Sequence, residues 1–358
     1  MKTMTTKIVT INPADIEHCE NDIKYAAEII KRGGLVAFPT ETVYGLGGDG
    51  TNPEASKKIY AAKGRPSDNP LIIHIATPAD AEKYTYTCDT FYKLAERFMP
   101  GPLTVVMTAR ESVPRETRGG LDTVAVRCPS NPIARRLIEL AGVPIAAPSA
   151  NLSGSPSPTA AHHVIDDMNG RVDMIIDGGS SDIGLESTIV KIESDGSLTL
   201  LRPGMITPHE LACVAPVSIA DAVVDELKEG EVALSPGMKY RHYAPKAPLV
   251  LLDGEIDDVI SYVKAEACSK IAILYYLDDQ ELIASRLPYA KRYVIGAKDN
   301  IKEQAQHLFS ILREADKNNY DKIYAPIPSK DGVGLALYNR MIRAAAHTII
   351  DLRREGNG

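Results

Sequence analysis

The segment AAKGRPSDNPLIIHI (61–75) contains two cations in a short loop bounded by glycine and proline. Lys63 and Arg65 stand two residues apart, between a helical pattern and an apolar strand pattern. Arginine binds phosphate oxygens through its planar fork and lysine acts as a point charge, so the pair suits a polyphosphate. Ser67 and Asn69 add neutral hydrogen-bonding groups. The alternative interpretation is an ordinary solvated pair on the surface.

A second segment, APSANLSGSPSPT (147–159), is rich in small residues and prolines. Ser149, Asn151 and Ser157 supply hydrogen-bond donors and acceptors, and the lack of bulk lets a ligand approach the backbone. A flexible linker is the alternative. Because the segment stands between a predicted strand and a predicted helix, we expect an ordered active-site loop.

A third segment, PTETVYGLGGD (39–49), follows the apolar strand pattern of 34–38. Its hydroxyls and backbone amides suit a small polar ligand at the carboxyl end of a strand, and Gly45, Gly47 and Gly48 would permit close approach. The alternative is a glycine-rich turn without a ligand, which is common in α/β folds. The segment is not a P-loop, since G-x-x-x-x-G-K-[ST] is absent.

Two further arginines, Arg127 and Arg202, end apolar strand patterns, where a cation without a partner is costly. Structural salt bridges are one interpretation of each, and His74 is alternatively a histidine packed in the core. Together with Lys63 and Arg65, the two arginines suit two anions, such as an amino-acid carboxylate and a triphosphate. The motifs of acyl-serine, zinc-peptidase and protein-kinase chemistry are absent, so the residues favour binding and positioning over covalent catalysis.

The elements that position these residues alternate between strands and helices. Strands are expected at 35–38, 71–76, 103–108, 123–127, 172–176 and 188–192, and helices at 22–31, 53–62, 90–98, 132–141 and 159–168. From 247 onward a second alternation predicts strands at 248–252, 271–276, 292–295 and 322–326, with helices at 256–267, 280–285, 301–317 and 335–347. Regular alternation of this kind predicts a parallel sheet in the second part.

Composition excludes several classes of protein. The 358 residues suffice for about two domains at roughly 150 residues each, and we expect them at 1–206 and 247–358, joined by a linker at 207–246. No apolar run reaches the roughly 18 residues of a membrane-spanning helix, and no signal peptide begins the chain, so a cytoplasmic protein is expected. The net charge of −7 argues against a broad nucleic-acid surface. Five separated cysteines without a C-x-x-C pair fit neither a zinc ribbon nor a disulfide framework.

Six motifs in series resemble the YrdC-like family: PTETVYGLG, KGRPSDNPL, PGPLT, APSANLSGSPSPT, STIV and LRPG. The linker motif SPGMKYRHYAP (235–245) resembles the two-domain branch of that family, the threonylcarbamoyl-AMP synthases. The resemblance is strong to residue 204 and looser from 247 onward. It implies an α/β fold, with a YrdC-like twisted, open, mixed-sheet domain followed by a small Rossmann-like parallel α/β domain.

The same resemblance implies an enzyme, a nucleotidyltransferase acting as L-threonylcarbamoyladenylate synthase. Such an enzyme condenses L-threonine, bicarbonate and ATP, with Mg²⁺, into threonylcarbamoyl-AMP and pyrophosphate, the carbamate oxygen attacking the α-phosphate. A separate tRNA threonylcarbamoyl-transfer complex receives the product and modifies tRNAs that read A-starting codons. Direct tRNA binding by this chain is expected to be weak or absent, and no residue is assigned to a metal.

The family pattern also implies roles for single residues. It places Lys63, Arg65, Ser67, Asn69, Thr123, Ser149, Ser157 and Arg202 beside ATP, and Thr40, His74, Arg127, Ala147 and Ser187 beside L-threonine. The catalytic group comprises Lys63, Arg65, Ser149 and Asn151, and Arg127 binds the threonine carboxylate. In the linker, Tyr240, Arg241 and His242 are expected to close over ATP, with plain tethering of the two domains as the alternative.

Two other functions are possible alternatives for this sequence. Hydrogenase maturation proteins share a YrdC-like domain, but they normally add zinc fingers, and this chain has no C-x-x-C. A module for RNA binding or ribosome assembly is the alternative outside enzymology. The acidic net charge weakens it, and salt-dependent RNA binding without ATP turnover would support it.

Overall fold

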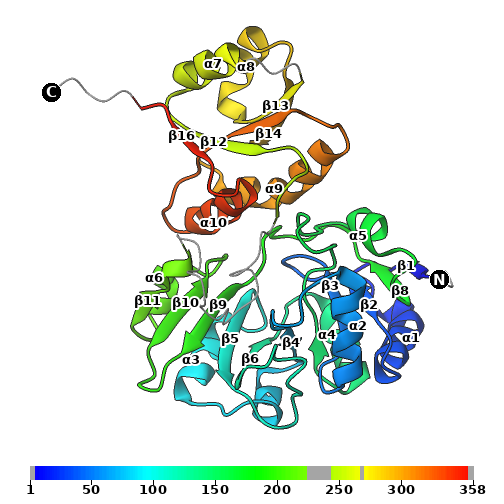
Figure 1. Ribbon diagram of the computed structural model, residues 1–358. Coiled ribbons are helices and arrows are strands. Elements are labelled where there is room, and N and C mark those ends of the chain that lie inside the picture. Colours follow the sequence, from blue (N-terminus) through cyan, green and yellow to red (C-terminus); the bar gives the residue numbers. More distant parts are fainter. Residues whose placement is uncertain (1–4, 224–242, 267–269, 354–358) are drawn as a thin grey trace. The chain divides into compact units, whose positions relative to one another are not determined.

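The computed structural model describes residues 5–223, 243–266 and 270–353. The chain divides into two compact units. The first comprises 1–153 and 157–240, and the second comprises 154–156 and 241–358 (Figure 1). Within the described residues, no helix is both long and apolar enough to cross a membrane.

The described part of the first unit contains an eleven-stranded mixed sheet. In spatial order its strands are β1 (Lys7–Thr10), β8 (Met174–Asp177), β2 (Val36–Phe38), β3 (Gly45–Asp49), β7 (Ile145–Ala146), β4 (Ile72–His74), β6 (Thr123–Arg127), β5 (Leu103–Thr108), β9 (Thr188–Ile192), β10 (Leu198–Arg202) and β11 (Val217–Ile219). Strands β4 and β6 run parallel, whereas β5 and β6 run antiparallel. The parallel β4–β6 register sets His74 opposite Arg127, so two predicted site residues end neighbouring strands.

Helices of the first unit are α1 (Glu20–Lys31), α2 (Pro53–Lys63), α3 (Asp89–Phe98), α4 (Pro132–Ala141), α5 (Ala161–Met168) and α6 (Pro208–Ala212). Helix α2 shows how the sequence sets an end. Asn52 accepts a hydrogen bond from the Glu54 amide, Pro53 occupies the first turn, and Gly64 takes the left-handed conformation (φ 62°) after the last turn. Proline at the start and glycine just past the end favour these boundaries, which fix Lys63 as the last helical residue.

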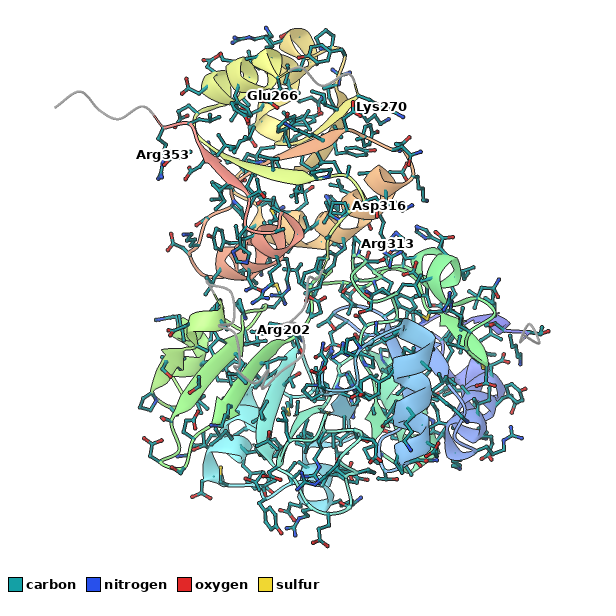
Figure 2. The ribbon with its side chains drawn as sticks, in the orientation of Figure 1. Arg202, Glu266, Lys270, Arg313, Asp316 and Arg353 are labelled. Carbon is teal, nitrogen blue, oxygen red and sulfur yellow. The ribbon has the colours of Figure 1, made fainter. Side chains whose placement is uncertain are left out.

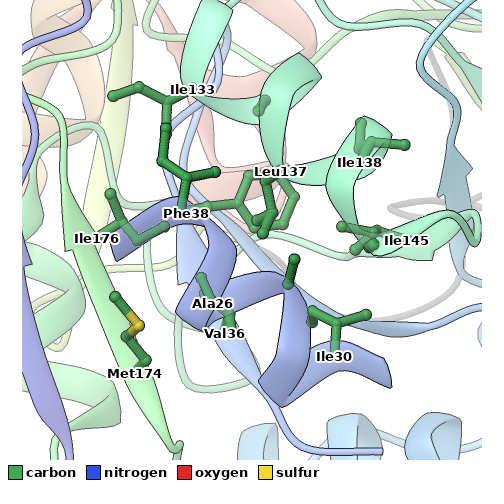
Figure 3. Close-up of a cluster of buried hydrophobic side chains, with 14 of the residues drawn as sticks. Ala26, Ile30, Val36, Phe38, Ile133, Leu137, Ile138, Ile145, Met174 and Ile176 are labelled. Atoms are coloured by element: carbon green, nitrogen blue, oxygen red, sulfur yellow. The ribbon is translucent and has the colours of Figure 1, made fainter. Parts of the chain in front are cut away.

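One core of the first unit lies between helices α1 and α4 and strands β2 and β8 (Figure 3). Phe38 of β2, Ile30 of α1 and Leu137 of α4 are fully buried there, next to Met174 of β8. Burial of side chains this large stabilises by roughly 1.5–3 kcal/mol each. The core therefore fixes the end of β2, from which the segment 39–45 leaves toward the candidate site.

The glycines of 39–49 allow the chain to pack closely, and the approach of a ligand to them stays a prediction. Residues 45–49 form strand β3, which pairs antiparallel with both β2 and β7. A Cβ on Gly47 would lie 2.7 Å from side-chain atoms of Phe38 and Ile145, and one on Gly48 would lie 3.2 Å from Leu35. Residues 45–49 are therefore not the glycine-rich turn of the alternative interpretation, and their glycines let a strand lie close against bulky neighbours.

The second unit contains a five-stranded sheet in the order β14 (Lys291–Gly296), β13 (Ile271–Tyr276), β15 (Lys322–Pro326), β12 (Leu249–Asp253) and β16 (Ile349–Asp351). Every described pair in it is parallel, as predicted. Its helices are α7 (Ile256–Ala265), α8 (Gln280–Arg286), α9 (Ile301–Asp316) and α10 (Gly334–Ala344). Helices α7 and α8 lie on one side of this sheet, with α9 and α10 on the other (Figure 1).

Three residues from the middle of the predicted active-site loop, 154–156, are part of the second unit. Buried Arg313 of α9 donates to the Pro156 carbonyl from Nε at 3.0 Å and from Nη2 at 2.7 Å. The Ala244 amide donates to the Gly154 carbonyl at 3.1 Å, and Tyr243 contacts the Phe309 ring. Residues 154 and 156, at the centre of the loop, therefore accept hydrogen bonds from residues about 90 and 157 positions later in the chain.

The predicted linker of 207–246 includes elements that the structure assigns to the first unit. Helix α6 follows a capping box made by Thr207 and Glu210, and β11 pairs in parallel with β10. The domain boundaries as we drew them stay a prediction. Tyr240, Arg241 and His242 lie outside the described residues.

Candidate substrate site

Lys63 binds the loop that begins at β7. Its ammonium donates to the Ser149 carbonyl at 2.5 Å, to the Asn151 carbonyl at 2.6 Å and to Asn151 Oδ1 at 3.2 Å. The Ser149 hydroxyl donates to the same Asn151 Oδ1 at 2.5 Å. The lysine is only 3% exposed, so these oxygens compensate a cation removed from water. Three of the four predicted catalytic residues are thus brought into direct contact.

Arg65, the fourth, lies just past the αL glycine that ends α2. Its guanidinium donates to the Asn69 carbonyl at 3.2 Å and to the Pro70 carbonyl at 3.0 Å. Asn69 is buried, and its Oδ1 has no hydrogen-bond partner among the described residues. Ser67 is exposed. The loop 64–70 thus presents a partly buried guanidinium and an unused amide oxygen, groups able to bind a polar ligand.

Arg127 forms a buried ion pair, which is the structural salt bridge that the sequence analysis gave as one interpretation of this residue without naming its partner. Its Nη2 lies 2.7 Å from Glu41 Oε1, with side chains 5% and 6% exposed. The same Nη2 lies 3.5 Å from the Thr40 hydroxyl. Within the described chain, Arg127 Nε and Glu41 Oε2 are buried without hydrogen-bond partners. The guanidinium is therefore oriented by one carboxylate and retains donor capacity for a second anion.

His74 ends β4 beside this pair. Its Nδ1 lies 3.3 Å from the Ile145 carbonyl, and its ring meets Phe38 edge-on. Burial, and secondarily the charge of Arg127, lower the pKa of His74 to about 3. The imidazole is therefore neutral near pH 7. In the tautomer that carries its proton on Nδ1, this nitrogen donates to the Ile145 carbonyl.

Arg202, labelled in Figure 2, ends β10 and is 7% exposed. It donates from Nε to the Ser187 carbonyl at 3.0 Å and from Nη2 to the Ser187 hydroxyl at 3.2 Å. The Ser187 hydroxyl also meets that of Thr104 at 2.7 Å, and Thr104 pairs with Arg127 in the β5–β6 register. These contacts connect Arg202, through Ser187, to Thr104 on the strand that pairs with the strand of Arg127.

Ser157 is completely buried and donates to Glu186 Oε1 at 2.5 Å. Glu186 precedes Ser187 in the chain, so this hydrogen bond joins the end of the loop 147–159 to the residues beside Arg202. Ser157 is therefore hydrogen-bonded to a carboxylate. The negative charge of this carboxylate would repel a triphosphate at close range.

The segment 40–45 connects the two groups of cations. At one end Thr40 and Glu41 contact Arg127. At the other, the Tyr44 amide donates to the Pro158 carbonyl, the Ala150 amide donates to the Tyr44 carbonyl, and Gly45 forms a bridge with Ser149. The same short segment thus lies against Arg127 and against the loop that Lys63 binds.

Two predicted residues are placed differently from the rest. Thr123 begins β6, so at about 3.3 Å per residue it lies roughly 13 Å along the strand from Arg127. Ala147 is buried, and its amide donates to the Ile72 carbonyl at 2.9 Å. Ala147 can offer a ligand its small size and no side-chain polar group.

The sequence did not predict three of the residues that contact the site. Glu41 pairs with Arg127, Thr104 hydrogen-bonds with Ser187, and Glu186 accepts a hydrogen bond from Ser157. Glu41 and Glu186 lie inside quoted motifs, and an acid at such a position was a usable signal. Among the described residues there is no group of three or more His, Cys, Asp or Glu side chains able to hold a metal ion.

Two family models match consecutive parts of the chain. The model described as "Telomere recombination", for Sua5, YciO and YrdC proteins, matches residues 28–204. The model described as "Threonylcarbamoyl-AMP synthase, C-terminal domain" matches 206–346. The fold and these matches define a two-domain protein of the Sua5 type.

Relatives agree over nearly the full length. The threonylcarbamoyl-AMP synthase of Pyrococcus abyssi is 43% identical, covering 92% of this chain and 95% of its own. That of Bacillus subtilis is 41% identical, covering 97% and 100%. The chain belongs to the threonylcarbamoyl-AMP synthase family. A crystal structure of P. abyssi Sua5 complexed with L-threonine matches with a TM-score of 0.84 and 41% identity, covering 98% of this chain and 99% of that one.

Proposed function

We propose that this chain is an L-threonylcarbamoyladenylate synthase, a nucleotidyltransferase that converts L-threonine, bicarbonate and ATP into threonylcarbamoyl-AMP and pyrophosphate. The observation that carries the proposal is the agreement, at 41% and 43% identity over nearly the whole chain, with two relatives of that name. The buried cations add a physical reason, since Lys63, Arg127 and Arg202 come from separate segments and suit several anionic groups.

Threonine is assigned to the Arg127 group. Its carboxylate would bind the guanidinium, whose Nε is buried without a partner among the described residues, while Glu41 holds the side chain in place. Support comes also from the neighbours Thr40, His74, Ala147 and Ser187, because hydroxyls and a neutral imidazole suit an amino acid better than a triphosphate. The relative solved with L-threonine makes an amino-acid site the expectation for this fold.

ATP is assigned to the Lys63 group and its neighbours. The residues are Lys63, Arg65, Ser67, Asn69, Thr123, Ser149, Ser157 and Arg202, with Asn151 between the two substrates. Lys63 already holds the loop through three oxygens, so we assign it a double role, in loop order and in phosphate charge neutralisation. Ser157 has the least structural support in this set, because its hydroxyl already donates a hydrogen bond to Glu186.

The proposed chemistry needs proximity and charge neutralisation more than a base. Bicarbonate gives carbon dioxide and hydroxide, and the neutral amine of threonine adds to the carbon dioxide. The proton that the amine loses combines with the hydroxide to form water, and the product is an anionic carbamate. Its oxygen forms a bond to the α-phosphorus while the bond to the β-phosphate oxygen breaks, and pyrophosphate leaves. Positioning and cationic stabilisation are the main contributions to phosphoryl-group transfer generally. His74, held neutral, adds no positive charge to the site.

The remaining parts of the proposal concern what surrounds the reaction. Mg²⁺ would arrive with ATP, since it is usually held by substrate phosphates and few carboxylates. Closure of Tyr240, Arg241 and His242 over ATP stays a prediction. The product would pass to a tRNA threonylcarbamoyl-transfer complex in the cytoplasm, with little direct tRNA contact by this acidic chain.

The test is pyrophosphate release from ATP with bicarbonate, Mg²⁺ and each of threonine, serine, valine or no amino acid. Release that requires both threonine and bicarbonate supports the proposal. Release without an amino acid, or none at all, contradicts it. Salt-dependent RNA binding without ATP turnover would instead favour the RNA-binding alternative.

A further inference from the structure

The second unit contains a cavity of about 110 Å³ that the proposed synthase reaction does not use. It lies at the carboxyl ends of three neighbouring strands. Leu252 of β12, Tyr276 of β13 and Pro326 of β15 contribute to its lining, together with Asp279 and Lys298 from the segments after β13 and β14. The cavity is therefore built entirely within one unit.

Its position is the one where parallel sheets bind ligands. Strand β15 lies between β12 and β13. The connections after β12 and β13 run through α7 and α8 on one side of the sheet, whereas the connection after β15 runs through α10 on the other (Figure 1). Neighbouring strands thus send their connections to opposite sides, which opens a crevice at their carboxyl ends.

The inner wall of the cavity is apolar. Val259 of α7, Ile273 of β13 and Tyr324 of β15 line it, and all three are buried members of the core under α7 and α8. The volume is below the roughly 300–1,000 Å³ typical of pockets for drug-sized ligands. A small molecule with a short apolar part fits such a space, and a whole nucleoside does not.

The polar edge of the cavity has charged side chains of both signs, and these side chains have no ion-pair partner within the described chain. Within the described chain, the side chains of Asp279, Lys298 and Glu255 form no ion pair or hydrogen bond, and the Tyr276 hydroxyl has no partner. Asp279 is half-buried, and burial is the main cause that raises its pKa, with Lys298 acting in the opposite direction. Asp279 and Lys298 thus influence each other electrostatically without joining in an ion pair.

The loop bearing the lysine is fixed. The Lys298 amide donates to Asp278 Oδ2 at 2.8 Å, and Gln304 donates to the Ala297 and Lys298 carbonyls at 2.7 and 3.2 Å. The backbone at Lys298 is therefore held by hydrogen bonds, whereas the Lys298 side chain forms none within the described chain. A binding site needs this combination of a positioned backbone and a charge without an internal partner.

We propose that this cavity binds a small free α-amino acid. The ligand's ammonium would pair with Asp279, its carboxylate with Lys298, and its side chain would enter the apolar end beside Ile273. A phosphate is disfavoured, because Glu255, Asp257 and Asp258 stand at the start of α7 and offset the attraction of that helix end. A zwitterion satisfies both signs of charge at once.

The experiment is isothermal titration calorimetry of the full chain with glycine, alanine, serine, threonine, valine and leucine. Propionate, propylamine, adenosine and inorganic phosphate serve as probes that carry only part of the proposed chemistry. We expect saturable 1:1 binding of at least one amino acid, and we expect Asp279→Asn to weaken it. Adenosine and phosphate can also bind at the proposed ATP site, so their binding counts toward the cavity only where Asp279→Asn or Lys298→Met weakens it. Amino acids that also occupy the Arg127 group are separated by repeating the titrations on Arg127→Ala at a temperature below its measured Tm, since this substitution changes no residue of the second unit.

Asp279→Asn and Lys298→Met each remove one charge, and each should weaken binding about 10- to 150-fold, the value of one charge-assisted hydrogen bond. Lys291→Met is the matched control, because this exposed lysine of β14 does not line the cavity. Thermal unfolding of these three variants and of Arg127→Ala identifies the conditions under which each remains folded, and the titrations are made under those conditions.

Three results would overturn the proposal. One is the absence of any amino-acid binding beyond that lost in Arg127→Ala. Another is binding that both cavity variants leave unchanged, and the third is binding of adenosine that the cavity variants weaken and that is tighter than the binding of every amino acid. Loss of synthase activity in Arg127→Ala bears on the proposed function alone, so the two proposals fail separately.

Discussion

The buried pair of Arg127 and Glu41 gives the sharpest prediction for stability. Their side chains are 5% and 6% exposed and 2.7 Å apart. Replacing Glu41 with alanine leaves a guanidinium that water cannot reach and no carboxylate compensates. Breaking a buried pair in this way costs about 3–5 kcal/mol.

This energy converts to a measurable shift. The first unit has more than 200 residues, for which each kcal/mol moves the Tm by about 2–4 °C. Glu41→Ala should therefore lower the Tm by roughly 6–20 °C in a thermal scan near pH 7. The matched control is Glu28→Ala, which breaks an ion pair with Lys31 at 3.0 Å whose side chains are 55% and 42% exposed. That exposed pair contributes about 0–1 kcal/mol.

The double variant Glu41→Leu with Arg127→Met tests the cause. Because it removes both charges together, it should be more stable than either single variant. It should also lose threonine-dependent pyrophosphate release, whereas Glu28→Ala should keep it. The reasoning is refuted if Glu41→Ala shifts the Tm no more than Glu28→Ala does. It is equally refuted if the double variant shows the sum of the two single losses.

Three further predictions concern the reaction and its pH dependence. Lys63→Ala should slow pyrophosphate release by about 30- to 1,000-fold, or 2–4 kcal/mol of transition-state stabilisation, and a rate within threefold of wild type would remove Lys63 from the mechanism. Serine should be the best wrong substrate, about 10- to 200-fold below threonine because one methyl group is lost, and faster turnover of valine would contradict a site that recognises the hydroxyl. Because the pKa of His74 is lowered to about 3, the unfolded state takes up a proton near pH 6.5 that the folded state refuses. The free energy of unfolding should therefore fall between about pH 6.5 and 3, and His74→Gln should flatten that dependence, as denaturation at several pH values will show.

The elements that sequence predicts well are those with dense β-branched runs or clear caps. The predicted strands at 103–108, 123–127 and 188–192 coincide with β5, β6 and β9, and the predicted helix at 132–141 coincides with α4. Strand β3 could not be predicted in the same way, because GLGGD has one apolar side chain and four residues that disfavour strands. Its pairing depends on Phe38 and Ile145 filling the space above the glycines.

Site partners show a similar limit. The types of Lys63, Ser149 and Asn151 marked them as binding residues, and the structure brings them into contact. The pairing of Glu41 with Arg127 spans 86 residues, and it depends on how the segment after β2 approaches the end of β6. No local pattern encodes that approach. Residue chemistry could be predicted from the sequence, but which carboxylate accompanies which cation could not.

The second unit is formed by two separate parts of the chain, residues 154–156 and 241–358, and the ribosome synthesises these parts at different times. Pro156 and Arg313, which hydrogen-bond to each other, are 157 residues apart. At about 5–20 residues per second, a ribosome adds Arg313 roughly 8–30 s after Pro156. During that interval the centre of the loop has been made but lacks the donor that later holds it. A message truncated upstream of α9 would encode every residue of the loop. The resulting protein would nevertheless lack Arg313, the donor that hydrogen-bonds to the Pro156 carbonyl.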